Sequence, residues 1–274
     1  MPELPEVETI CRSLARKLEQ RRIVHVDIRL PRLIKWPSVG DFPGYILRRK
    51  ITSFQRRGKY LLLYLEGNMV LVIHLRMTGR LYYGSAESLP DRFTHVIFKF
   101  DNGDKLFYSD TRTLGTLYAM EESELWRIAG LFGMGPEPLS SEFTLDYFSG
   151  IAKKRRSSIK ALLLNQKIIG GLGNIYADEA LAIASIDPDR SACTLDQEET
   201  EQLYQAVNKV IAEGISHGGT TFRDYRDGEG RSGSHQHHLR VYGRSGEPCF
   251  TCGALIVRKE TAGRGTHFCP QCQK

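Results

Sequence analysis

Four cysteines near the end of the chain have the spacing of a metal site. They form two Cys-x2-Cys pairs, Cys249/Cys252 and Cys269/Cys272, with sixteen residues between the pairs. Two such pairs can supply four thiolates to one tetrahedral Zn²⁺ ion. The alternatives are two disulfides, which are disfavoured if the chain resides in a reducing cytosol, and four unrelated thiols. Because protein ligands would fill every coordination position, we predict a structural zinc and not a catalytic one.

The N-terminal residues could supply a nucleophile and an acid. If Met1 is removed, Pro2 becomes a secondary amine at the chain terminus. An α-amino group has a reference pKa of about 7.7–8.0, so a useful fraction is neutral and nucleophilic near pH 7. Attached to a sugar C1′, this amine would form an iminium, and a neighbouring carboxylic acid such as Glu3 could protonate the opening sugar oxygen. Apolar residues at helical spacing predict that a helix begins near Pro5.

Positive charge is concentrated in two parts of the sequence. From Arg231 onward there are seven basic and two acidic residues, and Arg264 lies between the two cysteine pairs with a glycine on each side. A second focus consists of residues 153–156, all basic, together with Lys160. A solvated basic surface is the alternative for each, but basic residues held by a metal module favour binding to nucleic-acid phosphates.

Hydrophobic patterning predicts β-structure first and helices later. Apolar and polar residues alternate from Val24 to Leu30, which predicts a half-buried strand. Short apolar runs joined by turn residues predict further strands of a sandwich or barrel at 59–65, 69–75, 95–100 and 105–108. Later apolar residues at helical spacing predict helices at 121–132, 143–152, 157–164, 175–184 and 195–214. The Gly-Pro-Glu-Pro stretch at 135–138 is typical of a linker. We therefore divide the chain into 1–130, a linker at 131–150, 151–238 and 239–274.

The composition is that of a globular protein. The chain has 274 residues, 41% of them hydrophobic, with six cysteines and a net charge of +6. Disorder and a collagen-like fibre are excluded. The longest apolar stretches fall well short of the ~20 residues of a membrane-spanning helix, and the start lacks a signal-peptide pattern. We expect no membrane association and a cytoplasmic location of the bacterial type.

Six motifs follow one another along the chain: Pro2-Glu3-Leu4-Pro5-Glu6-Val7-Glu8-Thr9, Arg57-Gly58-Lys59-Tyr60, His74-Leu75-Arg76-Met77-Thr78-Gly79, Gly135-Pro136-Glu137-Pro138-Leu139, Gly173-Asn174-Ile175-Tyr176 and the four-Cys finger. In these motifs and their order, the chain resembles the formamidopyrimidine-DNA glycosylase family from end to end. The resemblance implies an α+β multidomain fold: a two-layer β-sandwich with an N-terminal helix, a helix–two-turn–helix domain and a zinc-finger β-hairpin. It also implies one structural zinc, damaged double-stranded DNA as the partner, and a nucleoid-associated monomer.

The resemblance further implies a role for individual residues. Pro2 would be the Schiff-base nucleophile, Glu3 the proton donor and Glu6 a supporting carboxylate. Lys59 would contact phosphate and assist β-elimination, and Arg264 would contact the lesion phosphate and assist δ-elimination. Without the resemblance, Lys59 is a surface lysine at a strand end, and Asn174 an N-cap. The remaining expected DNA contacts are His74, Arg155, Asn174 and Tyr242.

Members of this family flip the damaged nucleotide out and fill the gap with side chains. Met77 and Arg112 match two of these, although alone they would be a core residue and a surface charge. At the third place the family usually has Arg/Lys-Phe-Gly, whereas this chain has Thr113-Leu114-Gly115. Leu114 can act as a wedge but cannot stack as an aromatic ring does. A second departure is Phe93, where relatives commonly carry a DNA-contacting histidine.

The Gly-rich stretch at 217–236 is long enough to be a mobile lid. The family uses this loop for the lesion, whereas a plain surface loop is the alternative. Its expected lesion-contacting residues are Gly218, Gly219, Thr220 and Thr221.

The resemblance predicts a bifunctional glycosylase and abasic-site lyase. It would remove 8-oxoguanine and formamidopyrimidines and then cut the strand by β,δ-elimination. An endonuclease VIII-like enzyme for oxidised pyrimidines and a non-catalytic, zinc-dependent DNA-binding relative are the two alternatives.

Overall fold

The computed structural model describes all 274 residues, which divide into two compact units. The first contains residues 1–132 and 217–234, and the second contains residues 133–216 and 235–274. The sequence division placed the segment 217–234 with the helices, but here it belongs to the first unit. The reason is a set of bonds to helix α1 (Leu4–Leu18), among them one from the Thr220 N–H to Glu6 Oε1 at 2.7 Å.

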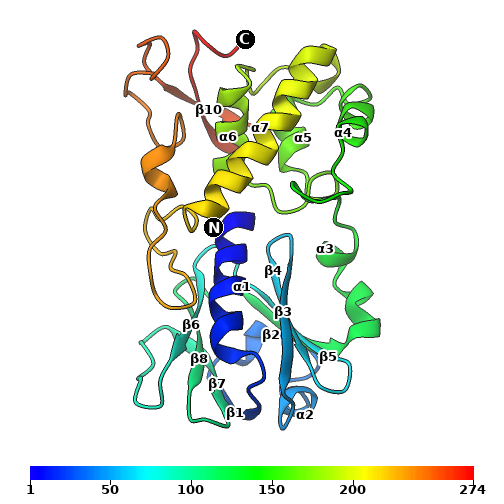
Figure 1. Cartoon of the computed structure of the whole chain (residues 1–274), viewed down its shortest axis with the longest axis vertical. Coiled ribbons are helices and arrows are strands. Elements are labelled where there is room, and N and C mark those ends of the chain that lie inside the picture. The colour runs from blue at the N-terminus through cyan, green and yellow to red at the C-terminus, as the bar shows by residue number, and fades with distance from the viewer. The chain divides into compact units, whose positions relative to one another are not determined.

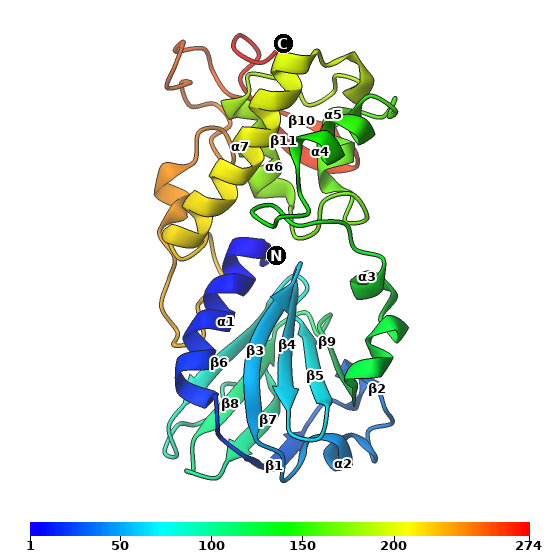
Figure 2. The same cartoon turned by 45° about the vertical axis from the view of Figure 1, so that its right-hand side comes forward.

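The first unit is a sandwich of two mainly antiparallel sheets (Figures 1 and 2). The four-stranded sheet has the order β1-β7-β8-β6, and the five-stranded sheet has the order β2-β9-β5-β4-β3, with β2 parallel to β9. The strands are β1 (Ile23–Ile28), β2 (Ile34–Trp36), β3 (Ile51–Arg57), β4 (Tyr60–Leu65), β5 (Met69–His74), β6 (Gly79–Gly84), β7 (Thr94–Phe100), β8 (Lys105–Asp110) and β9 (Thr116–Glu121).

Helix α1 closes the core of this unit. Its apolar face buries Val7, Ile10 and Leu14 against residues of both sheets, such as Leu63 and Phe98. The short α2 (Phe42–Ile46) adds to the same core. The helix expected at 121–132 is instead a 3₁₀ segment, Glu122–Arg127, followed by the single turn α3 (Ala129–Phe132). The 3₁₀ segment has no buried residue, so it lacks the apolar face that stabilises most α-helices.

The second unit combines helices with a β-hairpin. Its helices are α4 (Leu145–Ala152), α5 (Ile159–Leu164), α6 (Asn174–Ile183) and α7 (Gln197–Ser216), and its strands are β10 (Val257–Thr261) and β11 (Arg264–Phe268). The strands are joined by Ala262 and Gly263, with φ of +54° and +67°. Two successive left-handed residues make the tight turn that fits the twist of a hairpin. Arg264 therefore begins β11 directly after the turn.

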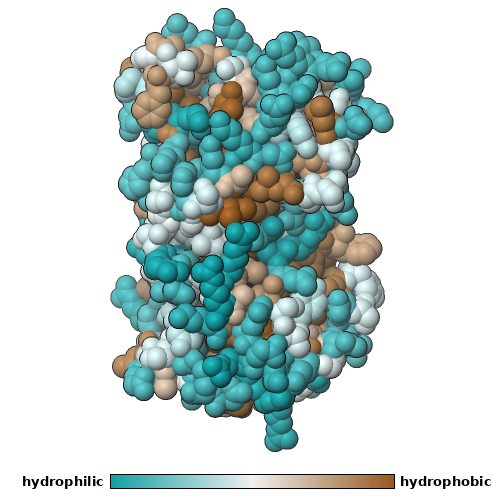
Figure 3. Space-filling model, viewed as in Figure 1, coloured by the Kyte–Doolittle hydropathy of each residue, from teal (hydrophilic) through white to brown (hydrophobic).

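The face drawn in Figure 3 is largely hydrophilic, with hydrophobic residues in small groups. None of the helices combines the length and the apolar composition that crossing a bilayer requires.

Candidate active site and nucleic-acid interface

Helix α1 begins with a reciprocal capping box. The Glu3 backbone N–H donates to Glu6 Oε2 at 2.8 Å, and the Glu3 carboxylate accepts the backbone N–H of Glu6 in return. Both side chains are buried, with 3% and 2% exposed. Pro5 lies in the first turn, where its missing N–H costs no helical bond. The bonds fix Glu3 next to Pro2, and the positive end of the helix favours carboxylates here.

The Gly-rich loop 217–234 folds against the same carboxylate. Besides the Thr220 N–H, which donates to Glu6 Oε1, the Tyr225 hydroxyl donates to the Gly218 carbonyl at 3.0 Å. Gly218 and Gly219 have φ of +69° and +84°, and a Cβ on Gly219 would lie 3.0 Å from the Glu6 side chain. Only glycine fits this close approach without strain. The structure thus brings the expected loop residues to the cap of α1.

Lys59 immediately precedes β4 and lies beside His74. Both are buried, with 7% and 6% exposed. The ring of Tyr60 meets the His74 ring edge-on, with centroids 4.4 Å apart. Burial, helped by the charges of Arg76 and Lys59, lowers the pKa of His74 to about 3, and Nδ1 accepts the Arg76 N–H at 3.0 Å. His74 is therefore a neutral imidazole that carries its proton on Nε2.

The side chains expected to fill the DNA stack project from two neighbouring turns. Met77 precedes β6, and Arg112 and Leu114 lie between β8 and β9. Met77 is 40% exposed and Leu114 47% exposed, so neither is a core residue. Thr113 has a φ of +53°, which is unusual for a β-branched residue, and its hydroxyl accepts a bond from Arg32. Strained backbone of this kind gathers at functional sites.

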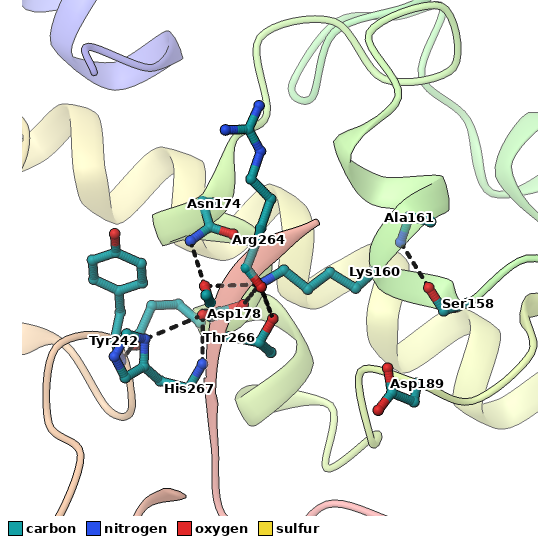
Figure 4. Close-up of polar contacts among 12 residues, drawn as sticks. Ser158, Lys160, Ala161, Asn174, Asp178, Asp189, Tyr242, Arg264, Thr266 and His267 are labelled. Atoms are coloured by element: carbon teal, nitrogen blue, oxygen red, sulfur yellow. Dashed lines mark hydrogen bonds and ion pairs between the residues drawn. The ribbon is translucent and has the colours of Figure 1, made fainter. Parts of the chain in front are cut away.

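In the second unit, Asn174 lies at the start of α6. The N-cap is Gly173, so Asn174 is the first helical residue and the alternative of an N-cap is wrong. Its side-chain amide donates to the Gly265 carbonyl of β11 at 2.8 Å (Figure 4). This bond joins the start of α6 to the strand that carries Arg264, and the positive end of a helix suits an anion.

A buried ion pair lies beneath this junction. Lys160 Nζ contacts Asp178 Oδ1 at 2.5 Å and donates to the Thr266 hydroxyl at 2.7 Å, and the Lys160 and Asp178 side chains are fully buried. The other Asp178 oxygen accepts the His267 N–H at 2.9 Å. Figure 4 shows the Arg264 side chain pointing away from this network. Lys160 is therefore not part of the exposed basic focus predicted from the sequence, whereas Arg155 is exposed after α4.

The neighbouring acid on α6 holds the segment with Tyr242. Glu179 is 1% exposed and accepts the N–H groups of Arg240, Val241 and Tyr242 at 2.7, 2.9 and 2.8 Å. Burial raises the pKa of Glu179. The Tyr242 ring meets His267 edge-on at 5.0 Å. Sequence reasoning missed Lys160, Asp178 and Glu179 as anchors; the signal is three charged residues inside apolar helical segments.

The four predicted metal ligands are together. Their sulfur atoms all lie within 4.8 Å of one another, with Cys249 and Cys272 4.0 Å apart and Cys252 and Cys269 3.5 Å apart. These distances exceed the ~2.05 Å of a disulfide and match the roughly 3.8 Å expected for thiolates on one tetrahedral zinc with Zn–S bonds of ~2.3 Å. The thiolate set fits Zn²⁺ and leaves no coordination position for a substrate. The cluster can hold one structural zinc ion, at the open end of the β10–β11 hairpin.

Three family models match consecutive parts of the chain. The formamidopyrimidine-DNA glycosylase N-terminal domain matches residues 1–117, the H2TH domain of the same enzymes matches 134–226, and the zinc finger found in FPG and IleRS matches 246–274. The zinc-finger match and the cysteine cluster agree on one zinc ion.

Similar proteins cover the full length. Formamidopyrimidine-DNA glycosylases of Desulforamulus reducens and Heliobacterium modesticaldum are both 49% identical over 100% of this chain and 99% and 100% of their own. A complex between Lactococcus lactis Fpg and DNA containing an abasic site has a TM-score of 0.93 at 33% identity, covering 99% of each chain. The MutM (Fpg) protein of Thermus thermophilus has a TM-score of 0.91 at 40% identity, covering 99% of this chain and 98% of its own. This chain belongs to the formamidopyrimidine-DNA glycosylase family and is a DNA glycosylase.

Proposed function

We propose that this enzyme excises oxidised purines, 8-oxoguanine and formamidopyrimidines, from duplex DNA and cuts the strand at the resulting abasic site by β,δ-elimination. The observation that carries the proposal is the capping box of α1, which holds the Glu3 carboxyl buried directly after Pro2. Solved complexes of Lactococcus lactis Fpg with DNA containing an abasic site or Fapy-dG support this substrate class.

The first step forms a covalent bond at Pro2. Once Met1 is removed, the Pro2 nitrogen attacks C1′ of the damaged nucleotide as the bond to the base breaks, and the amine proton balances the charge on the departing base. The C1′–O4′ bond then opens, and Glu3 donates the proton to O4′, which leaves an iminium between C1′ and Pro2. Glu6 supports this acid because it fixes the Glu3 backbone.

Two eliminations follow. Loss of a C2′ proton expels the 3′ phosphate, with Lys59 as the cation beside it, and a second elimination expels the 5′ phosphate with the help of Arg264. Hydrolysis then frees Pro2. Asn174, Arg155, His74 and Tyr242 are proposed to contact the DNA, because cations and amide or hydroxyl donors position the phosphate backbone.

We propose that different elements contact the flipped base and fill the gap that it leaves in the DNA stack. Met77, Arg112 and Leu114 fill the gap in the stack, and Gly218, Gly219, Thr220 and Thr221 close over the flipped base. Extrusion costs a few kcal/mol, which the filling side chains offset.

The proposed setting is damaged chromosomal DNA in the bacterial cytoplasm, with the enzyme acting as a monomer. Residues 1–130 would form the catalytic domain, 131–150 the linker, 151–238 the DNA-binding domain and 239–274 the finger. Within the third range, the loop 217–234 would act with the catalytic domain.

Borohydride trapping tests the chemistry. With an 8-oxoguanine duplex, the wild type should give a covalent adduct on the peptide that begins at Pro2. Pro2→Gly should lose at least 90% of it, and Glu3→Gln should release the base poorly but still be trapped on a ready-made abasic site. Glu8→Gln is the matched control, since Glu8 lies in the same helix but pairs with Arg56.

Two results would overturn this assignment. One is an adduct on a lysine, and the other is a retained Met1 in fully active enzyme, because the Pro2 nitrogen is then an amide. A preference for thymine glycol over 8-oxoguanine duplexes would instead indicate the oxidised-pyrimidine activity.

A further inference from the structure

Asp110, the last residue of β8, has the most densely bonded carboxylate in the first unit that no catalytic step uses. It is 1% exposed. Oδ1 accepts the Thr78 hydroxyl at 2.5 Å and the Arg112 N–H at 3.1 Å, and Oδ2 accepts the N–H groups of Leu114 and Gly115 at 2.8 and 2.9 Å. Three of these donors belong to the turn 111–115, and the fourth belongs to the turn that precedes β6.

Thr78 is the link between the two turns. Its hydroxyl donates to Asp110 and also accepts the Arg112 N–H at 3.1 Å. Met77 is the neighbouring residue in the chain. One hydroxyl therefore joins the turn that carries Met77 to the turn that carries Arg112 and Leu114.

The space around this cluster leaves little freedom. A Cβ on Gly115 would lie 1.5 Å from the Tyr108 hydroxyl, and a Cβ on Gly79 would lie 2.8 Å from the same hydroxyl and 2.4 Å from the Leu75 carbonyl. The Tyr108 hydroxyl itself donates to Asp110 at 3.3 Å. Both turns therefore pack against the buried Tyr108, so a shift of either turn would disturb the other.

We propose that Asp110 and Thr78 are positioning residues that hold Met77, Arg112 and Leu114 as one fixed array for entry into the DNA stack. This inference rests on the proposed function, in which these three side chains fill the vacated place. Met77 comes from one turn and Arg112 and Leu114 from the other, and side chains ordered before binding lose less conformational freedom when they insert. The bonds to Asp110 supply that order without contacting the DNA.

Thr78→Val is the direct test, since valine keeps the shape of threonine and removes the hydroxyl. The probe is a duplex with a tetrahydrofuran site opposite 2-aminopurine, whose fluorescence reports insertion without any chemistry. We expect Thr78→Val to slow the insertion phase at least fivefold, and Thr78→Ser, which restores the hydroxyl, to stay within twofold of the wild type. Asp110→Asn should slow it further, because its amide would face backbone N–H donors.

The controls separate this proposal from a folding defect and from the proposed function. Thr78→Val should keep a thermal midpoint near that of the wild type, and trapping on a ready-made abasic site should fall less than twofold. Insertion by Thr78→Val at the wild-type rate, or an equal defect in Thr78→Ser, overturns the positioning role. If the wild type itself neither inserts nor excises, the proposed function fails instead.

Discussion

In the first unit, the turns that carry Met77 and Leu114 are fixed by the Asp110 carboxylate, which accepts bonds from neutral donors. In the second unit, the strand that carries Arg264 is fixed by a buried ion pair between Lys160 and Asp178. Three backbone N–H groups that donate to Asp110 lie within five residues of it, whereas Lys160 and Thr266 are 106 positions apart. Removal of the Asp110 side chain would leave only neutral donors unpaired, whereas removal of the Lys160 side chain would leave the buried Asp178 carboxylate without its cation.

Loss of the zinc ion should have the largest effect, because the β10–β11 hairpin would then depend on the buried ion pair between Lys160 and Asp178. Cys252→Ser should lose the metal and most lesion-DNA binding, since zinc binding is worth roughly 10–16 kcal/mol in zinc-finger peptides and is coupled to folding. Elemental analysis and a binding titration measure both. Cys193→Ser, a change at an exposed free thiol, is the control. Stoichiometric zinc in Cys252→Ser would contradict the assignment.

Lys160→Met should destabilise the protein by about 3–5 kcal/mol, because it leaves the Asp178 charge buried without its partner. The double variant Lys160→Met, Asp178→Leu should recover much of this loss. Urea unfolding gives the free energies, and Lys154→Met at an exposed position is the matched control. A cost below about 1 kcal/mol, typical of a surface pair, would remove the contrast between the two units.

Leu114→Phe should tighten binding to a lesion duplex by about 1–3 kcal/mol, because an aromatic ring stacks on a base where leucine cannot. Base excision should quicken as well, and Leu114→Ala should do the reverse. On a ready-made abasic site the changes should be small, since unpairing is largely complete there. Equal effects on both substrates would mean that the wedge lies elsewhere.

Acidification should weaken the first unit through His74. Its folded-state pKa is depressed from 6.5 to about 3, so as the pH falls below 6.5 the unfolded chain takes up the proton first and stability is lost. Between pH 7 and 5.5 the free energy of unfolding should fall by about 1 kcal/mol from this group. In His74→Gln that portion of the pH dependence should be missing. An unchanged slope in the variant would show that His74 is protonated in the folded state.

The smallest effect concerns phosphate contact. Arg264→Ala should flatten the slope of log Kd against log salt by about one unit, as one released counterion predicts. Leu114→Ala should leave the slope unchanged because its side chain carries no charge. If Leu114→Ala flattened the salt slope as much as Arg264→Ala does, stack filling and phosphate binding would not be divided between the two units as proposed.

Short-range patterns in the sequence were sufficient for much of this structure. The cysteine spacing predicted the metal cluster, and the apolar runs of β4 and β5 predicted the hairpin around Gly67, because periodicity and turn chemistry act within a few residues. The start of α1 could also be predicted, since Pro5 and the carboxylates mark it locally.

Long-range partners could not be predicted in the same way. Lys160 looked like part of a basic surface because its charge is visible in the sequence, while its partners at Asp178 and Thr266 are set by tertiary packing. The loop 217–234 likewise joined the first unit through Glu6, which is 214 positions from Thr220. Nothing in the local pattern specifies either pairing.

The space around Tyr108 determines which positions of the turn can vary in evolution. Position 115 is closed to any residue larger than glycine, since a Cβ there would overlap the tyrosine hydroxyl and still lie 2.7 Å from its ring if the hydroxyl were lost. The Leu114 side chain is about half exposed, and the bond to Asp110 uses its backbone and not its side chain. The side chain at position 114 can therefore be exchanged while the hydrogen-bonded frame that presents it stays constant.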